Sequence, residues 1–303
     1  MSATMVTGGL GFVGRYIVRA LLASGDRVVS YNRDFSESDD ERLVAVQGEL
    51  FDIPRLVRVM GEHDVDTVIH TAAMSHPELS IDLPITTFAA NVDGTLHLFE
   101  AARMAGVGRL VNFSSECAYG HHEDAIDEDA PLRPTTPYGV TKVATELLGR
   151  VYTDRYGLDV VSLRVTEVYG PGNPMPETLK ELLQAALSGA GYALDRGGDH
   201  RLQLVHAEDV AAAALAAAGC NGDHASVYNI TGGSQVTLHE LAALIRGRFP
   251  EFRADIGDGH IATLDRQGPF DIAAARRDLG YEPRWSLDEG IDAYADWLRL
   301  HPR

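Results

Sequence analysis

A glycine-rich turn near the start of the chain constrains the fold more than any other feature. It reads Thr7-Gly8-Gly9-Leu10-Gly11-Phe12-Val13-Gly14 and stands between an apolar run, residues 3–6, and a segment with helical periodicity, residues 12–24. Glycines at 8, 11 and 14 permit a tight turn, a close approach of backbone to a diphosphate, and packing of the helix on the strand. A diphosphate would then lie on the free N–H groups at the positive end of the helix. We therefore predict a dinucleotide site here, with Gly8, Gly11, Phe12 and Val13 in contact with the cofactor.

Short apolar runs alternate with helical segments through the first half of the chain. We predict further strands over residues 27–31, 67–69, 109–113 and 159–163, and helices over residues 87–105 and 138–155. Strands that alternate with helices form βαβ crossovers and a parallel sheet. The sequence thus predicts an α/β fold, a Rossmann-type doubly wound parallel sheet, over residues 1–165.

The alternation ends after Arg164, and the second half carries different signals. Three prolines (Pro171, Pro174 and Pro176) indicate a loop, and helices are predicted over residues 177–187, 207–218 and 238–249. We interpret residues 166–303 as mainly a smaller C-terminal substrate-binding lobe, with segments that return to the Rossmann sheet. Such a lobe would lie across the carboxyl edge of the sheet, where folds of this kind bind ligands.

The end of the second predicted strand bears on the choice between NAD and NADP. It reads Tyr31-Asn32-Arg33, where NAD-binding chains commonly place a carboxylate against the adenosine ribose. Asn32 has no charge to repel a 2′-phosphate, and Arg33 could pair with it. The alternative is a solvated loop arginine beside an NAD site. We expect NADP or NAD, with NADP preferred. Glu49 and Leu50 follow the next strand-like run, where Glu49 could reach the adenine amine or simply be a surface charge.

Tyr138 and Lys142 stand four residues apart at the start of a predicted helix and therefore share one face. A lysine near the phenol would lower the pKa of the tyrosine and make it a usable proton donor and acceptor. Upstream, Ser114 and Ser115 end a strand at the carboxyl edge of the sheet, where a hydroxyl could stabilise charge on a substrate oxygen.

At these residues the chain resembles the extended short-chain dehydrogenase/reductase family, also called the NAD-dependent epimerase/dehydratase family. The resemblance covers almost the whole length; it also includes His70-Thr71-Ala72-Ala73, Asn91 to Thr95, Glu146, Tyr169-Gly170-Pro171-Gly172 and His206 to Val210. It implies that Ser115, Tyr138 and Lys142 are catalytic, that Thr71, Ala72 and Ala73 contact the cofactor, and that the protein is a homodimer. His70 and His206 are expected to be structural.

The chain departs from the family pattern at positions that contact substrate. Family members that dehydrate nucleotide sugars carry Asp-Glu after the catalytic hydroxyl, whereas this chain has Glu116 and Cys117. Nucleotide-sugar members usually have asparagine at the position of Glu167 and arginine at that of Leu202. Arg201 and Arg266 remain as arginines that could hold a phosphate. Dehydration is therefore disfavoured, and a nucleotide diphosphate substrate is placed in doubt.

Charge and cysteine content limit the partners. The formal net charge is −18, which disfavours nucleic acid and membrane surfaces. The chain has two cysteines, too few for a disulfide framework, and no histidine spacing typical of a metal site, so no metal is expected. No signal peptide is visible, and we expect a cytoplasmic protein.

These observations together predict an NAD(P)-dependent oxidoreductase that transfers hydride at a secondary alcohol or ketone of a sugar-like substrate. The alternative within the family is a nucleotide-sugar epimerase, such as a UDP-sugar 4-epimerase, that retains NAD. A non-catalytic nucleotide sensor is the alternative from another class. It would need none of Ser115, Tyr138 and Lys142.

Overall fold

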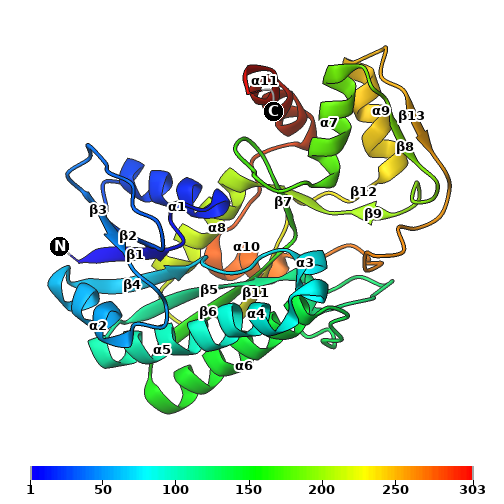
Figure 1. Ribbon diagram of the computed structural model, residues 1–303. Coiled ribbons are helices and arrows are strands. Elements are labelled where there is room, and N and C mark those ends of the chain that lie inside the picture. The colour runs from blue at the N-terminus through cyan, green and yellow to red at the C-terminus, as the bar shows by residue number, and fades with distance from the viewer. Residues whose placement is uncertain (1, 302–303) are drawn as a thin grey trace.

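The structure, a computed structural model, describes residues 2–301 and places a parallel sheet between two layers of helices (Figure 1). The sheet has the strand order β11-β6-β5-β4-β1-β2-β3, and all neighbouring strands are parallel. Its strands are β1 (Ala3–Thr7), β2 (Arg27–Asn32), β3 (Leu43–Gln47), β4 (Val65–His70), β5 (Arg109–Ser115), β6 (Asp159–Val165) and β11 (Val227–Ile230). The predicted Rossmann-type α/β fold is confirmed, and the strand order reverses between β1 and β4, the usual ligand-binding position.

Apolar residues at successive strand positions explain the two helical layers. One layer consists of α1 (Phe12–Ala23), α8 (Ala207–Gly219) and α10 (Ala273–Leu279), and the other of α2 (Ile53–Glu62), α5 (Gly94–Ala105) and α6 (Pro137–Tyr156). Adjacent side chains of one strand point to opposite faces, so Val6 packs in the first layer and Met5 in the second. A sheet buried on both faces requires such continuous apolar runs.

The segment before α5 differs from the single helix predicted over residues 87–105. It consists of α3 (Pro77–Asp82), α4 (Pro84–Phe88) and a π-helical turn, Ala89–Asp93, which leads into α5. Pro77 and Pro84 each begin a helix, because proline has no N–H to donate and is tolerated in the first turn. The π-turn has no strong sequence signal, and such turns often occur at functional sites.

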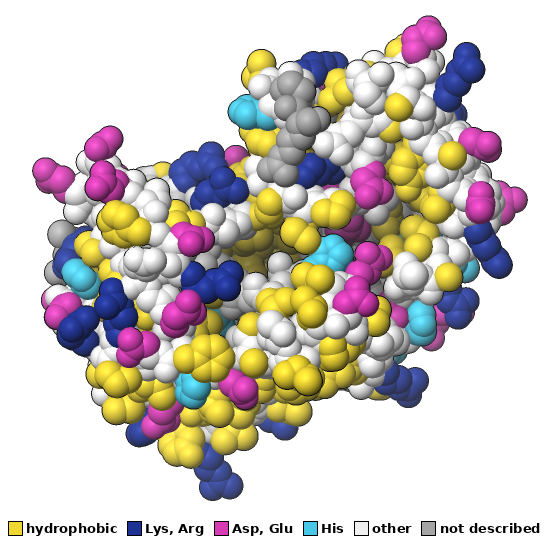
Figure 2. Space-filling view, in the orientation of Figure 1, with side chains coloured by type: hydrophobic (Ala, Val, Ile, Leu, Met, Phe, Trp, Pro, Cys, Tyr) yellow, Lys and Arg dark blue, Asp and Glu magenta, His cyan; other side chains and the backbone are white. Residues whose placement is uncertain are grey.

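A smaller lobe lies beyond the carboxyl ends of the sheet strands (Figure 1). Its core is formed by α7 (Thr178–Ser188), α9 (Leu238–Arg248) and α11 (Leu287–Leu300). Short strands complete it: β8 (Tyr192–Leu194), β9 (Arg201–Leu202), β12 (Val236–Thr237) and β13 (Ala254–Ile256). β7 (Glu167–Tyr169), which comes directly after β6 in the chain, pairs in parallel with β10 (Leu204–His206). Figure 2 shows a hollow between the lobe and the sheet.

The predicted helix over residues 207–218 is one of the segments that return to the sheet, although its sequence pattern does not distinguish it from the helices of the lobe. The helix, α8, packs on the sheet and against α1. Its core-facing side chains are mostly alanines, among them Ala211, Ala213, Ala214 and Ala217, which are all buried. Small side chains permit a close approach of the helix to the sheet, but they give a weak amphipathic signal in the sequence.

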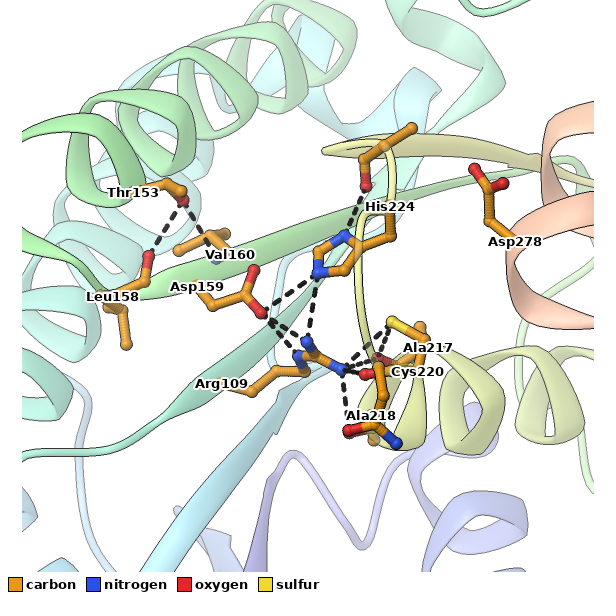
Figure 3. A network of polar contacts seen from close by, with 12 residues as sticks. Arg109, Thr153, Leu158, Asp159, Val160, Ala217, Ala218, Cys220, His224 and Asp278 are labelled. Atoms are coloured by element: carbon orange, nitrogen blue, oxygen red, sulfur yellow. Dashed lines mark hydrogen bonds and ion pairs between the residues drawn. The ribbon is translucent and has the colours of Figure 1, made fainter.

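A polar network joins α8 to the amino ends of β5 and β6 (Figure 3). Arg109, at the start of β5, donates to the Asp159 carboxylate at 2.5 Å and lies 3.1 Å from the Nε2 atom of His224. The same guanidinium donates to the carbonyls of Ala217 and Cys220 at the end of α8. A cation at a helix C-terminus satisfies carbonyls that lack partners in the helix.

We expect Arg109→Met to lower the free energy of unfolding by about 2 kcal/mol or more, because it leaves a half-buried carboxylate and helix carbonyls without their donor. Urea unfolding of the purified variant measures this. The matched control is Arg58→Met, whose partner Glu62 lies 3.8 Å away on an exposed helix face. There we expect a loss below about 1 kcal/mol. Equal stability of the two variants would contradict the anchoring role of Arg109.

Among residues 2–301, none of the helices combines the length and the hydrophobicity required to cross a lipid bilayer.

Candidate active site

The glycine turn between β1 and α1 has the geometry of a diphosphate cradle. Gly8 has a φ of 73°, and a Cβ atom there would lie 2.9 Å from the backbone of Ala72. A Cβ at Gly14 would lie 2.0 Å from the carbonyl oxygen of Gly8. The helix begins after Gly11 and has no side-chain cap in the described structure. Its first N–H groups, near Phe12 and Val13, therefore fit a bound diphosphate.

The segment after β4 lies against this turn. Thr71 is fixed to the end of β1 by two hydrogen bonds. Its hydroxyl donates to the carbonyl of Thr7 at 2.8 Å, and its N–H donates to the same oxygen. Ala72 contacts the position of Gly8, and Ala73 is exposed. Thr71 and Ala72 thus lie beside the diphosphate cradle, and Ala73 follows them in the chain, as the family resemblance predicts.

Asn32 braces the glycine turn. Its Oδ1 atom accepts from the N–H of Leu10 at 2.9 Å, and its Nδ2 atom donates to the hydroxyl of Ser30. Arg33, the next residue, is exposed, and the ion pairs between described residues do not include it. Glu49 is exposed beyond β3, its carbonyl accepts from the hydroxyl of Tyr31, and Leu50 packs near Gly94. Arg33 and Glu49 are therefore free to face a ligand at this end of the sheet.

Close packing of α6 on the end of β5 brings the predicted catalytic residues together. A Cβ atom at Gly139 would lie 2.4 Å from the carbonyl oxygen of Cys117, so only glycine permits this approach. Thr136 caps the helix by accepting from the N–H of Gly139 at 3.1 Å. Because Tyr138 stands in the first turn, its side chain is held beside the residues that follow β5.

Ser115, Tyr138 and Lys142 form one buried group. The hydroxyl of Ser115 lies close enough to the phenol of Tyr138 to lower its pKa, and it accepts from the N–H of Cys117 at 3.2 Å. The ammonium of Lys142 lies 5.3 Å from the centre of the Tyr138 ring and donates to the carbonyl of Phe113 at 2.7 Å. Ser114 instead donates to Glu146, which leaves Ser115 as the serine beside Tyr138.

The expected lowering of the tyrosine pKa by Lys142 is not found. Burial raises the pKa of Tyr138, the charges of Cys117 and Glu116 raise it further, and the nearby Ser115 hydroxyl opposes them. Burial also lowers the pKa of Lys142 to about 8. The ammonium is directed to the Phe113 carbonyl rather than to the phenol oxygen, and desolvation of the phenolate therefore dominates.

Carboxyl groups surround the predicted substrate side of this group. Burial raises the pKa of Glu116 well above its usual value, and the negative charges of Glu167 and Asp265 raise it further. Burial raises the pKa of Glu167 to about 7. For Cys117, burial and the neighbouring Glu116 raise the thiol pKa to about 12, so the thiol stays protonated at neutral pH.

The two predicted phosphate-binding arginines are not brought to this group. Arg201 is exposed on β9, opposite Thr237 of β12, and within residues 2–301 its side chain forms no hydrogen bond or ion pair with the catalytic residues. Arg266 pairs with Glu123 at 3.0 Å, and its backbone N–H donates to His121. Leu202, at the usual arginine position, is buried in the core of the lobe.

His70 has the structural role expected of it. Its ring nitrogens are hydrogen-bonded to the hydroxyls of Thr7 at 2.7 Å and Thr95 at 2.9 Å, and burial lowers its pKa to about 3. A histidine that stays neutral at physiological pH bridges β1, β4 and α5 rather than carrying protons. His206 caps α8 and stacks on Trp285, with 4.1 Å between ring centres.

Several supporting residues were not assigned roles from the sequence. Ser80 accepts from the N–H of Tyr138 at 3.0 Å, and no sequence signal marks it. Asn91, in the π-turn, joins the backbone of Met74 to the hydroxyl of Thr141 on α6. Glu146 forms a buried two-point ion pair with Arg164 at 2.7 and 2.9 Å. The spacing of Glu146 from Lys142 places both on one face of α6 and could have indicated its role.

The structure contains one group of metal-type ligands in its described part, formed by Asp199, His239 and Asp258 on the lobe. One ligand atom from each lies within 4.8 Å of the others. Sequence spacing could not indicate this group, because its members are far apart in the chain. They are separate from the catalytic hydroxyls, and exposed acidic groups of this kind are common without a metal.

The sheet, the glycine turn and the Ser-Tyr-Lys group define an extended short-chain dehydrogenase/reductase. The model of the NAD dependent epimerase/dehydratase family matches residues 4–231, and the chain belongs to this family. It is 32% identical to a dTDP-glucose 4,6-dehydratase of Streptomyces antibioticus, over 97% of this chain and 92% of that protein. It is 31% identical to a UDP-glucose 4-epimerase of Mycolicibacterium smegmatis, over 98% of each chain.

Solved structures agree with this assignment. The structure of MoeE5 in complex with UDP-glucuronic acid and NAD is similar with a TM-score of 0.90 and 31% identity, covering 99% of this chain and all (100%) of that one. A UDP-glucose 4-epimerase of Thermotoga maritima, solved with UDP-glucose, has a TM-score of 0.90 and 25% identity over 99% of this chain and 100% of that one. The protein is therefore an NAD-dependent enzyme of this family.

Proposed function

We propose that the protein transfers hydride at a secondary alcohol or ketone of a sugar-like substrate, with Tyr138 as acid/base. The observation that supports this most directly is the buried group of Ser115, Tyr138 and Lys142, in which two hydroxyls converge where a single substrate oxygen can bind. A cofactor sensor would not need such a group.

The chemistry of these residues follows from their placement. A nicotinamide cofactor, when bound, supplies the hydride donor or acceptor. The hydroxyls of Ser115 and Tyr138 orient the substrate oxygen, and Tyr138 transfers the proton. Lys142 places a positive charge 5.3 Å from the centre of the Tyr138 ring, although its hydrogen bond goes to the Phe113 carbonyl rather than to the phenol oxygen. Because the pKa of Tyr138 is raised, the phenol is protonated at neutral pH, which favours carbonyl reduction there, and oxidation should increase as the pH rises.

We expect Tyr138→Phe to lower turnover at least about a hundredfold, since loss of a general acid/base usually costs ~10²–10⁴ in rate. Its affinity for the cofactor and its unfolding midpoint should stay close to those of the wild type. Steady-state assays of cofactor reduction measure turnover, and Tyr156→Phe, at the exposed end of α6, is the matched control. Turnover near that of wild type in the pure Tyr138 variant would contradict the assignment.

We further propose that NADP binds at least as tightly as NAD. Gly8, Gly11, Phe12 and Val13 would hold the diphosphate, Thr71, Ala72 and Ala73 would flank it, and Asn32 and Arg33 would face the adenosine ribose with Glu49 and Leu50 near the adenine. The exposed guanidinium of Arg33 supports this, because it can pair with a 2′-phosphate. The solved relatives hold NAD, which is the alternative.

Arg33→Ala should weaken the binding of NADP by about 1–3 kcal/mol, which is the range for one charge-assisted pair. The binding of NAD should change much less. Titration of both cofactors into wild type and variant measures this. Arg150→Ala removes the same charge from an exposed site on α6 and should leave both affinities unchanged. Equal losses of NAD and NADP affinity in the Arg33 variant would mean that Arg33 packs on the adenine instead.

We propose that the preferred substrate lacks a nucleotide diphosphate. Glu116 and Glu167 lie on the substrate side of the catalytic group, Leu202 is buried, and Arg266 already pairs with Glu123. Burying phosphate charge without full pairing is costly. Dehydration is also disfavoured, because a Cys117 thiol with a pKa of about 12 cannot replace a carboxylate base.

Calorimetric titration of the cofactor-loaded enzyme with UDP, GDP and dTDP tests this proposal, and we expect no micromolar binding. The second candidate, a nucleotide-sugar epimerase with retained NAD, is favoured by the names of the relatives. Micromolar binding that Arg201→Ala or Arg266→Ala abolishes would support the epimerase. So would cofactor that stays bound through purification without net reduction during turnover.

We propose that the protein is a homodimer. Apolar side chains gather on the face formed by α4, α5 and α6 (Figure 2), and the exposed ones include Ile85, Met104, Leu147 and Val151. An exposed apolar patch of this kind is typical of a subunit interface, and light scattering of the purified protein measures its mass. A cytoplasmic location stays a prediction, based on two cysteines that are both free thiols.

A further inference from the structure

The segment between β13 and α10 leads from the lobe back to the sheet, and part of it lies beside the active site (Figure 1). We call residues 265–270 of this segment the strap. An isolated parallel bridge pairs Gln267 of the strap with His122, shortly after the end of β5. Gly268 permits this close approach, because a Cβ atom there would overlap the carbonyl oxygen of Asp124. The strap is thus packed directly against the segment that follows β5.

Two glutamine side chains outside the strap hold its backbone in place. Gln203, which is buried between β9 and β10, donates to the carbonyl of Gly268 at 2.9 Å and accepts from the N–H of Phe270 at 3.3 Å. Gln235, just before β12, donates to the carbonyl of Gln267 at 3.0 Å. The side chain of Gln267 therefore extends from a backbone that is fixed by several hydrogen bonds.

The side chain of Gln267 spans the turn that follows Ser115. Its amide nitrogen donates to the carbonyl of Glu116 at 3.1 Å and to the carbonyl of Gly120 at 3.2 Å. A glutamine amide has two N–H donors, and both have an acceptor here. The Glu116 oxygen also accepts from the N–H of Tyr119 at 3.0 Å, which closes the 3-10 turn. One side chain from the strap thus holds both ends of this turn.

The same turn determines where the Ser115 hydroxyl lies. That hydroxyl accepts from the N–H of Cys117 in the turn at 3.2 Å, so a displacement of the turn would displace or release it. The carbonyl of Cys117 lies against Gly139 in the first turn of α6, which also carries Tyr138. The turn is therefore held by α6 through its middle residue and by the strap through its two ends.

We propose that Gln267 is a positioning residue for the reaction, which fixes the Ser115 hydroxyl relative to the phenol of Tyr138 by holding the turn between them. This inference rests on the proposed oxidoreductase function and adds a residue from the second half of the chain to the same site. Gln267 acts through two backbone carbonyls. Two hydroxyls that bind one substrate oxygen must be placed accurately, since a displacement of about 1 Å can cost about a hundredfold in rate.

Gln267→Met retains the approximate size of the side chain and removes both donors. We expect it to lower kcat about tenfold or more, while the KM for NAD changes less than about twofold and the unfolding midpoint stays close to that of the wild type. Gln267→Asn keeps the amide but is too short to reach both carbonyls, so its kcat should fall similarly. Gln184→Met makes the same replacement at an exposed position of α7 and should leave kcat unchanged. Turnover is measured as NAD reduction with the fastest of glucose, galactose, UDP-glucose and dTDP-glucose.

A double-mutant cycle separates the positioning of Ser115 from a general structural role. Ser115→Ala alone should lower kcat by about 10²–10³, the usual cost of one lost donor to the reacting oxygen. In that background, Gln267→Met should lower kcat by less than about twofold, because no hydroxyl is left to position. A full tenfold loss in both backgrounds would overturn the proposal, as would wild-type kcat in both Gln267→Met and Gln267→Asn.

The outcomes also distinguish this inference from the proposed function. Unchanged turnover in both Ser115→Ala and Tyr138→Phe would contradict the function itself. A loss in those two variants, with no loss in either Gln267 variant, would overturn the positioning role and leave the function in place. A defect of Gln267→Met that consists only of a raised KM for NAD would also overturn the positioning role, because it would assign Gln267 to cofactor binding.

Discussion

The contact between Gly139 and the carbonyl of Cys117 sets the position of the whole catalytic group. It permits the first turn of α6 to lie on the turn that follows β5, so that Tyr138 reaches Ser115 and Lys142 reaches the carbonyl of Phe113. A side chain at 139 would require the helix to move outward from the strand end. Such a displacement would separate the two hydroxyls, because each is fixed to a different element.

A buried ion pair between α6 and β6 stabilises the same arrangement. Glu146 lies one helical turn after Lys142, and Arg164 of β6 is paired in register with Ser114. Their two hydrogen bonds, together with the Ser114 hydroxyl on Glu146, join α6, β5 and β6. Both side chains are buried, so replacing one residue alone would leave the charge of the other without its ionic partner.

The sequence was most informative where a local pattern determines the structure. The glycine turn, the strand-helix alternation and the four-residue spacing of Tyr138 and Lys142 predicted the sheet and the residues that meet at its edge. The sequence did not indicate which segments of the second half return to the sheet, because the alanines of α8 carry almost no directional signal. The Ser80 contact and the pKa of Tyr138 depend on tertiary packing and burial, which no local pattern encodes. The substrate side was the hardest to predict, since Glu116 and Glu167 come from separate segments.

Strand β5 begins at the anchoring residue Arg109 and ends at Ser115. The group that holds the sheet to α8 and the group that handles substrate therefore lie at opposite ends of one seven-residue strand, and so at opposite edges of the sheet. Substitutions at the Arg109 end should change how much folded protein a cell accumulates, while each folded molecule keeps its activity. Substitutions at the Ser115 end should change which compounds the enzyme converts, while the amount of folded protein stays the same. The two traits can thus be selected separately on a single strand.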